Sequence, residues 1–222
     1  MVEERIFVNT VKNVRPMKEG IEMSLIVGLT GGIASGKSTI SKMFQEEAIP
    51  VIDTDNIAHT LLKHNKTIYT SIVDSFGEEV LTPSKEINRN KLGKIVFKDK
   101  EKRELLNKIV HPKVKERVFK EIDHYKGLGE AMIVVDVPLL FEASFDTIMD
   151  KTIVVYAKRS DQIDRLKSRE NIDEAFAKQK IKSQMPLSKK KELADYCIDN
   201  TKSILETRKS FTRVLKKLKS LV

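Results

Sequence analysis

The chain has 222 residues, 40% of them hydrophobic, and a formal net charge of +9. This length supports a full hydrophobic core and favours one domain with an insertion over two independent domains. The single cysteine excludes an internal disulfide framework and a cysteine zinc site, and no apolar run reaches the roughly 20 residues of a membrane span.

The positive charge suits polyanionic small molecules and also nucleic acid. Only 6% of the residues are aromatic and none is Trp, so the sequence does not suggest a surface on which bases stack. We therefore expect no nucleic-acid partner and no membrane association. The single cysteine favours a reducing compartment, so we expect a cytoplasmic protein, with a monomer as the default state.

The first 22 residues lie ahead of the first apolar segment and contain Glu3, Glu4, Glu19 and Glu22. Transit peptides are poor in acidic residues and signal peptides have an apolar core, so this stretch resembles neither. We expect an N-terminal extension over residues 1–22, peripheral to the chemistry. Residues 23–222 are then expected to form a single domain.

Residues 25–30 are apolar and are followed by glycines, as is typical of a buried parallel strand. Residues 31–38 then fit G-x-x-x-x-G-K-[ST], the phosphate-binding loop, and a helix is expected from 36 to about 47. Backbone N–H groups and the helix dipole attract phosphate, Lys37 can reach the β- and γ-phosphates, and Ser38 can hold Mg²⁺. A glycine turn of another α/β fold is the alternative. The residues expected to contact a nucleoside triphosphate are Gly32, Ile33, Ala34, Ser35, Gly36, Lys37, Ser38 and Thr39.

Acidic residues stand at the ends of the next two expected strands. Asp53 and Asp55 follow the strand 50–53, and Asp136 lies near the end of the apolar strand 131–137. Strand carboxyl ends line the ligand crevice of parallel sheets. The aspartate pair therefore suggests a base for a hydroxyl nucleophile or a Mg²⁺ ligand, and Asp136 suggests a further Mg²⁺ ligand. A helix cap at the pair and a structural role for Asp136 stay open.

Residues 56–126 are expected to be mostly helical, because their apolar positions recur at helical spacing. One such stripe is Leu105, Ile109, Val114, Val118 and Ile122. We expect breaks near 76–77, 82–83 and 111–112, with His111-Pro112 starting a helix. His111 could contact a phosphate, although a lone His is more often structural. The block is typical of an insertion that carries substrate specificity.

A fourth strand is expected over 152–157, followed by helices over 160–170 and 173–185. Arg165 and Arg169 share one face of the first of these helices. Two arginines on mobile helices would form a lid that supplies cations to a transferred phosphate. A solvated charged face is the alternative.

Farther along, Lys189–Lys191 are expected on a solvated helix face, and a last strand over 196–199 contains Cys197, which is expected to be buried. Residues 204–222 predict an amphipathic helix docked on the sheet rather than on a membrane. Its expected apolar side consists of Leu205, Phe211, Val214, Leu215, Leu218 and Leu221. Strands alternating with helices predict an α/β fold with a parallel, helix-covered sheet.

Together these motifs closely resemble those of the dephospho-CoA kinase family. The resemblance rests on the loop within residues 28–39, Asp-x-Asp within 51–55, His-Pro within 109–112 and Pro-Leu-Leu-Phe-Glu within 137–142. Further matches are Asn88-Arg89, Arg165 with Arg169, and residues 194–200. Lys202 stands where the family often has glycine, and residues 1–22 have no counterpart.

The resemblance implies transfer of the ATP γ-phosphate, with Mg²⁺, to the ribose 3′-hydroxyl of dephospho-CoA. It implies a three-layer P-loop kinase fold with a five-stranded parallel sheet. The helical block over about 56–126 becomes a CoA-binding insertion, and residues 160–186 become the lid. Another small-molecule or nucleoside monophosphate kinase is the nearest alternative. A nucleotide-switched binding protein is an alternative of a different class.

Residue roles follow from the resemblance at matching positions. The implied catalytic residues are Asp55, as the base, with Lys37, Arg165 and Arg169. The implied Mg²⁺ ligands are Ser38 and Asp136. The implied acceptor-side residues are Thr30, Asp53, Asp55, Arg89 and His111. Asn200 is implied on the adenine side.

Overall fold

The computed structural model describes residues 24–222 and places five parallel strands in one sheet of order β2-β3-β1-β4-β5. The strands are β1 (Leu25–Gly31), β2 (Val51–Asp53), β3 (Met132–Asp136), β4 (Lys151–Tyr156) and β5 (Tyr196–Asp199). The expected α/β fold with a five-stranded parallel sheet is confirmed. The expected extension over residues 1–22 lies outside the described residues.

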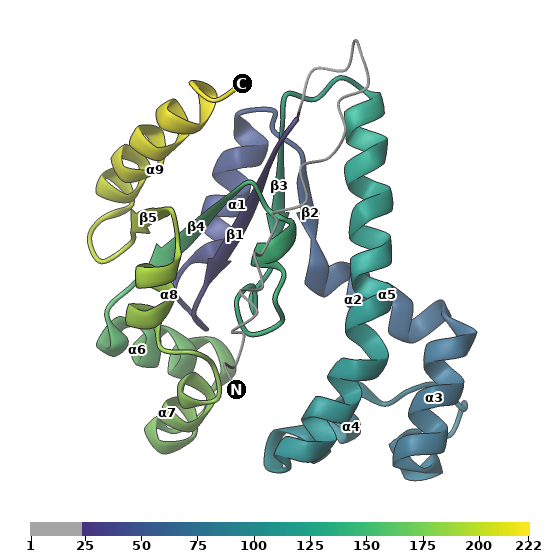
Figure 1. Cartoon of the computed structure of the whole chain (residues 1–222). Coiled ribbons are helices and arrows are strands. Elements are labelled where there is room, and N and C mark those ends of the chain that lie inside the picture. The colour runs from purple at the N-terminus through teal and green to yellow at the C-terminus, as the bar shows by residue number, and fades with distance from the viewer. Residues whose placement is uncertain (1–23) are drawn as a thin grey trace, which may run out of the picture.

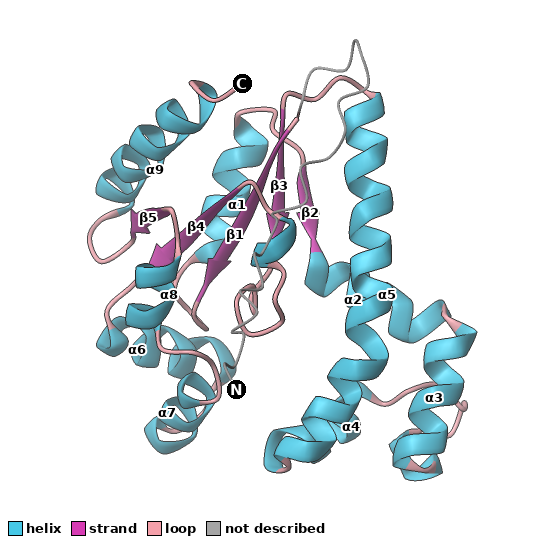
Figure 2. Cartoon of the chain, viewed as in Figure 1, coloured by secondary structure: helices cyan, strands magenta, loops and turns pink. Residues whose placement is uncertain are grey.

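Helices cover both faces of this sheet, and a helical group extends beyond it on the side of β2 (Figures 1 and 2). The α-helices are α1 (Lys37–Glu46), α2 (Thr54–His64), α3 (Lys66–Phe76), α4 (Arg89–Lys98), α5 (Lys100–Gly127), α6 (Arg159–Glu170), α7 (Glu174–Lys182), α8 (Leu187–Leu193) and α9 (Ile204–Lys219). Two 3₁₀ turns, η1 (Glu78–Val80) and η2 (Asp146–Ile148), lie in connections. Between residues 24 and 222, no helix combines the length and the apolar character that crossing a membrane requires.

Alternating strand residues feed two hydrophobic clusters, one on each face of the sheet. Val27 and Leu29 belong to a cluster with α1 and α9, in which the rings of Phe44 and Phe211 meet edge to face at 4.8 Å. Ile26 belongs to the other cluster, which gathers apolar residues of α2 to α5. The central strand is therefore covered on both faces, and the loop at its carboxyl end is anchored to the most buried part of the fold.

The expected break at His111-Pro112 is wrong, because α5 runs without interruption through Pro112. Proline lacks the N–H that would bond the carbonyl of Lys108, but its fixed φ suits a helix. Lys108 and Pro112 are both exposed, so water can bond to the Lys108 carbonyl. The buried stripe of Val110, Val114 and the following turns holds the two halves of the helix in one line against the core.

Three other expectations need correction. The run 189–191 is not wholly solvated, since Lys190 on α8 is fully buried. On the expected apolar stripes, Leu105, Leu205 and Leu221 are 40%, 61% and 49% exposed, whereas the rest of the α9 stripe is buried. Cys197 is half-buried. Residue spacing alone therefore predicts an apolar stripe that is longer than the part of the helix packed against the protein core.

Candidate active site

The glycine-rich loop follows β1 and enters α1, as expected. Ala34 and Gly36 adopt left-handed conformations, with φ of 58° and 93°, and the Ser35 N–H donates to the Gly32 carbonyl at 3.0 Å. The backbone N–H groups without an acceptor among residues 24–222 include those of Ala34, Gly36, Lys37 and Ser38. Successive free N–H groups at a helix N-terminus form a concavity suited to an anion.

A lysine and an aspartate meet directly beside this loop. In the β1–β3 register Leu29 lies opposite Asp136, at the carboxyl ends of both strands. Lys37 Nζ forms an ion pair with one Asp136 oxygen, and Ser41 Oγ donates to the other at 2.5 Å. The Lys37 and Asp136 side chains are only 19% and 7% exposed. Two of the residues predicted to bind phosphate and Mg²⁺ are thus in contact.

Asp53 and Asp55 separate into two different roles. Asp53 caps α2, since its carboxylate accepts the N–H groups of Asp55 at 2.9 Å and Asn56 at 3.1 Å. The capping alternative therefore holds for Asp53. Asp55 lies in the first turn of α2 with no hydrogen bond to its carboxylate among the described residues, so that carboxylate is available to a ligand.

The surroundings of Asp55 oppose its ionisation. Desolvation is the largest influence and raises the pKa of this carboxyl, although much of the residue is open to solvent. The charges of Asp53 and Asp136 raise the pKa further, while Lys37 and Arg89 lower it. The balance is a raised pKa. Arg89, at the start of α4, and Asp136, at the end of β3, therefore lie close enough to act on the same carboxyl.

Two predicted acceptor-side residues have partners inside the protein. Thr30 is buried, and its hydroxyl donates to the Pro138 carbonyl at 3.1 Å. His111 is half-buried on α5 and lies edge to face with Phe145, their ring centroids 6.4 Å apart. Burial, followed by the charge of Lys115, lowers the pKa of His111, so the imidazole is neutral at pH 7.

The two predicted lid arginines occupy different environments. Arg165 on α6 donates to the Ala34 carbonyl at 3.4 Å and to the Asn200 carbonyl at 3.3 Å, so it lies against the loop. Arg169 is exposed and pairs with Glu170 at 2.9 Å. Asn200 itself is buried, and its side-chain amide donates to the Ser35 carbonyl at 2.7 Å. The structure brings Arg165 and Asn200 to the loop and leaves Arg169 outside it.

Sequence reasoning missed a buried ion pair behind the site. Lys190 Nζ lies 3.0 Å from Glu142 Oε1 and donates to the Pro138 carbonyl at 2.7 Å. The same Glu142 oxygen accepts the Met185 N–H at 3.0 Å, at the point where the chain returns from α7. Desolvation is the main influence on Lys190 and lowers its pKa. The sequence signal for this ion pair was Glu142, the last residue of the Pro-Leu-Leu-Phe-Glu motif.

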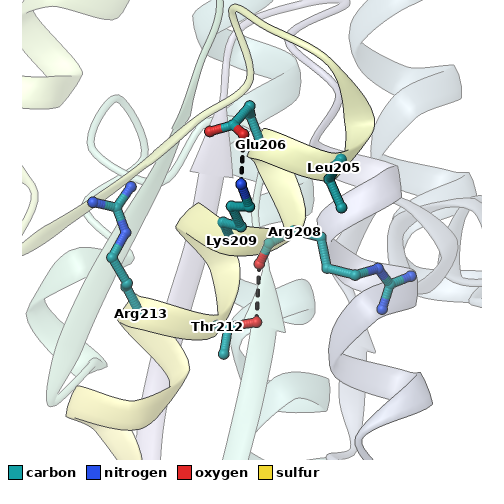
Figure 3. A pocket seen from close by; sticks show the side chains of 6 residues that line it. All are labelled: Leu205, Glu206, Arg208, Lys209, Thr212 and Arg213. Atoms are coloured by element: carbon teal, nitrogen blue, oxygen red, sulfur yellow. Dashed lines mark hydrogen bonds and ion pairs between the residues drawn. The ribbon is translucent and has the colours of Figure 1, made fainter.

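A surface hollow of about 600 Å³ lies elsewhere, on the outer face of α9. Its lining residues are Leu205, Glu206, Arg208, Lys209, Thr212 and Arg213. All come from one helix, Lys209 is paired with Glu206, and the two arginines point to opposite sides (Figure 3). Among residues 24–222, no group of three or more His, Cys, Asp or Glu side chains could hold a metal ion. The loop and strand ends remain the best-formed site.

Comparison with known proteins agrees with this geometry. Residues 25–206 match the family model described as dephospho-CoA kinase. A dephospho-CoA kinase of Bacillus anthracis is 46% identical over 88% of this chain and 98% of its own length, and one of Arabidopsis thaliana is 44% identical over 86% and 82%. A solved dephospho-CoA kinase of Campylobacter jejuni has a TM-score of 0.66 and 29% identity over 88% of this chain and 98% of its own. A match over this much of the sequence shows that the chain belongs to the dephospho-CoA kinase family.

Proposed function

We propose that this chain transfers the γ-phosphate of ATP to the ribose 3′-hydroxyl of dephospho-CoA, giving CoA and ADP in the last step of CoA synthesis. Family membership supports the kinase activity, ATP as phosphoryl donor and dephospho-CoA as acceptor. One structural observation carries the proposal. The phosphate-binding loop, the Lys37–Asp136 pair and the Asp55 carboxylate, which has no hydrogen-bond partner between residues 24 and 222, follow the carboxyl ends of neighbouring strands.

The chain's own cations and dipoles would carry most of the catalysis. Phosphoryl transfer passes through a loose transition state, so positioning and charge neutralisation contribute more than covalent chemistry. The loop N–H groups would bind the phosphate oxygens, and Lys37 would turn from Asp136 toward the β- and γ-phosphates. Arg165 is already at the loop. Arg169 would have to leave Glu170 to join it.

Asp55 would orient the 3′-hydroxyl and take its proton. Its raised pKa makes it a better proton acceptor than an ordinary aspartate. Arg89 is close enough to counter the charges of Asp55 and an incoming anionic acceptor. We assign CoA binding to the helical block α2 to α5. Thr30, Asp53 and His111 would line the acceptor site and would not take part in the phosphoryl transfer.

The residues at the strand ends fit Mg²⁺. This hard cation is typically held by one or two carboxylates together with substrate phosphates and water. Asp136 supplies a carboxylate, and the exposed Ser38 hydroxyl lies in the first turn of α1. Bound there, the metal would neutralise charge on the β- and γ-oxygens. We propose ATP with Mg²⁺ as the donor, and a monomeric, cytoplasmic enzyme.

The test is a coupled ADP-release assay with ATP, Mg²⁺ and dephospho-CoA, with the product checked by mass spectrometry. Lys37→Ala should abolish turnover in a folded protein. Lys42→Ala, an exposed lysine on the same helix, should leave turnover unchanged. ATP binding without an added phosphate on dephospho-CoA would discard the acceptor, and normal turnover of folded Lys37→Ala would discard the loop assignment.

A further inference from the structure

We propose that Gln162 and Asn200 are positioning residues that aim two N–H groups of the loop at the triphosphate. The carbonyls of three successive loop residues each accept a side-chain hydrogen bond. Gln162 Nε2 donates to the Ile33 carbonyl at 2.6 Å, and Asn200 Nδ2 donates to the Ser35 carbonyl at 2.7 Å. Arg165 reaches the carbonyl between them at 3.4 Å, a weak distance. This inference rests on the proposed binding of a triphosphate at the loop.

Peptide geometry turns these carbonyl contacts into control of the N–H groups. In a planar trans peptide the C=O and the N–H of the next residue point in opposite directions. Holding the Ile33 carbonyl therefore directs the Ala34 N–H, and holding the Ser35 carbonyl directs the Gly36 N–H. Both of those N–H groups lack an acceptor among the described residues. Without the two amides, either peptide could rotate and present a carbonyl oxygen to the phosphates.

We call each side-chain hydrogen bond to a loop carbonyl a brace. The shorter braces lie on the peptides whose N–H has no acceptor among the described residues, and the longer one lies on the peptide whose N–H is already bonded. The weakly held Ala34 carbonyl belongs to the peptide whose N–H, that of Ser35, already donates to Gly32. That peptide is fixed from within the loop and needs no strong external partner. The two short hydrogen bonds fall on the two peptides whose N–H groups are left for a ligand.

The environment holds both amides in place. Gln162 and Asn200 are only 4% and 8% exposed. The buried Thr207 hydroxyl donates to Asn200 Oδ1 at 2.8 Å, which turns the Nδ2 group toward the loop. A Cβ at Gly32 would lie 2.6 Å from Gln162 Nε2, and one at Gly36 would lie 2.1 Å from Asn200 Nδ2. Two motif glycines thus leave room for the two amides.

This assignment gives Asn200 a different role from an adenine contact, and two ligands separate the roles. Inorganic tripolyphosphate with Mg²⁺ probes the loop without a base, whereas ATP with Mg²⁺ probes the loop and the base contacts together. We would measure the affinity of Gln162→Met, Asn200→Ala and Thr207→Val for each ligand by calorimetry. Thr207→Val keeps the side-chain volume and removes only the hydroxyl that orients Asn200. Gln179→Met, at an exposed position on α7, is the matched control.

We expect Gln162→Met and Asn200→Ala each to weaken both ligands by the same factor, about 3- to 10-fold, the effect of one net hydrogen bond. Thr207→Val should weaken both by a smaller factor, and Gln179→Met should change neither. The KM for dephospho-CoA should stay near the parent value, whereas the Tm of Asn200→Ala should fall, because the buried Thr207 hydroxyl and Ser35 carbonyl lose their hydrogen-bond partner. A loss confined to ATP would make Asn200 an adenine contact and overturn the proposal.

Other outcomes are equally decisive. Unchanged affinity for both ligands in Gln162→Met and Thr207→Val would show that the loop needs no brace. A rise in the KM for dephospho-CoA together with a lowered Tm would show a general structural role instead. If the parent protein bound neither ATP nor tripolyphosphate, the proposed function would fail, whereas parent binding with unaffected variants would reject only the brace.

Discussion

Asp55, the proposed base, is a residue at which the proposed function and the stability of the fold oppose each other. Its folded-state pKa is raised, first by desolvation and then by the charges of Asp53 and Asp136. A raised carboxyl pKa means that the folded state binds the proton more tightly than the unfolded state does. The group's contribution to stability is therefore present at low pH and is lost as the pH rises through the folded pKa. At neutral pH the ionised Asp55 carboxylate therefore makes the folded state less stable than a protonated carboxyl would.

Asp55→Asn should lower kcat about 100-fold, the low end of the range for a general base, because the loose transition state places less demand on the base. The KM for ATP should change little. The Tm at pH 7 should rise, since the unfavourable ionisation is removed, and the gain should vanish near pH 3. Steady-state kinetics and thermal unfolding at both pH values test this. Equal losses in kcat and ATP affinity would point to a structural role.

The pH profile of the parent enzyme provides a separate test of the same carboxyl. The base must be ionised to act, so kcat/KM should fall as the pH drops through a pKa above the ordinary aspartate value of 3.8. His111 should not contribute a charge near neutrality, because its pKa is lowered. An acid limb at or below the ordinary value would argue against Asp55.

Lys190 and Glu142 form a buried pair whose two halves are not equivalent. Glu142→Gln would keep an acceptor for the Met185 N–H but leave a fully buried ammonium without its countercharge, at a cost of about 3 kcal/mol. Lys190→Met should cost less, because the Glu142 side chain is 22% exposed and can be hydrated. The double variant should be close to Lys190→Met. Urea unfolding of all four proteins tests the cycle, and additive losses would contradict it.

At the scale of elements, α5 contains a proline that its helix does not need. Pro112→Ala would restore an N–H to bond the exposed carbonyl of Lys108 and should stabilise the protein by about 1–2 kcal/mol. The gain stays below the roughly 3 kcal/mol propensity difference because proline also restricts the unfolded chain. Thermal unfolding tests this, and an unchanged or lowered Tm would show that the proline relieves strain elsewhere.

The element scale also shows what sequence patterns can and cannot predict. The strands, α1 and α9 were predictable because their signals are local in the sequence. These signals are apolar runs, apolar residues at helical spacing, and glycines where an element ends. The continuity of α5 was not, because a proline signal is local while the packing that overrides it comes from α2, α3 and α4. Lys190 was placed on a solvated face for the same reason. Its countercharge is far away in sequence, at the end of a different loop.

At the scale of the whole molecule, α6 and α7, the helices predicted to form a lid, contribute to a small hydrophobic cluster separate from those of the sheet. That cluster has three buried side chains, Ile163, Leu166 and Ala177, packed against the loop residues Ile33 and Ala34. Both sheet clusters contain many more buried residues. A region with little buried apolar surface opens at lower free energy than the global unfolding. We therefore expect α6 and α7 to open more readily than the sheet, as a lid would require.

Amide exchange should reveal this difference. Amides of α7 should exchange faster than those of β1 in the free protein, and ATP with Mg²⁺ should slow exchange in α6 and α7 more than in α9. Exchange read by mass spectrometry, with and without nucleotide, is the measurement. Equal protection of α7 and β1 in the free protein would contradict the expectation that α6 and α7 open separately from the sheet.

The same scale explains which candidate site residues were predictable. The loop, Asp55 and Asp136 follow from local motifs at strand ends, which parallel topology brings to one edge. The braces could not be predicted, since Gln162 and Asn200 act on residues 129 and 165 positions away. An amide that bonds a distant carbonyl has no signature in its own neighbourhood.

The Lys37–Asp136 pair has a consequence for what the resting enzyme accepts. A polyphosphate without a metal would attract the Lys37 ammonium away from Asp136. The Asp136 carboxylate would then lie unpaired beside the negative phosphate oxygens. A bare divalent cation would capture the carboxylate and leave the ammonium facing a like charge. Only a ligand that carries both signs can replace both halves of the pair together. We therefore expect the resting enzyme to bind the metal–nucleotide complex more tightly than it binds a metal-free polyphosphate or a free divalent cation.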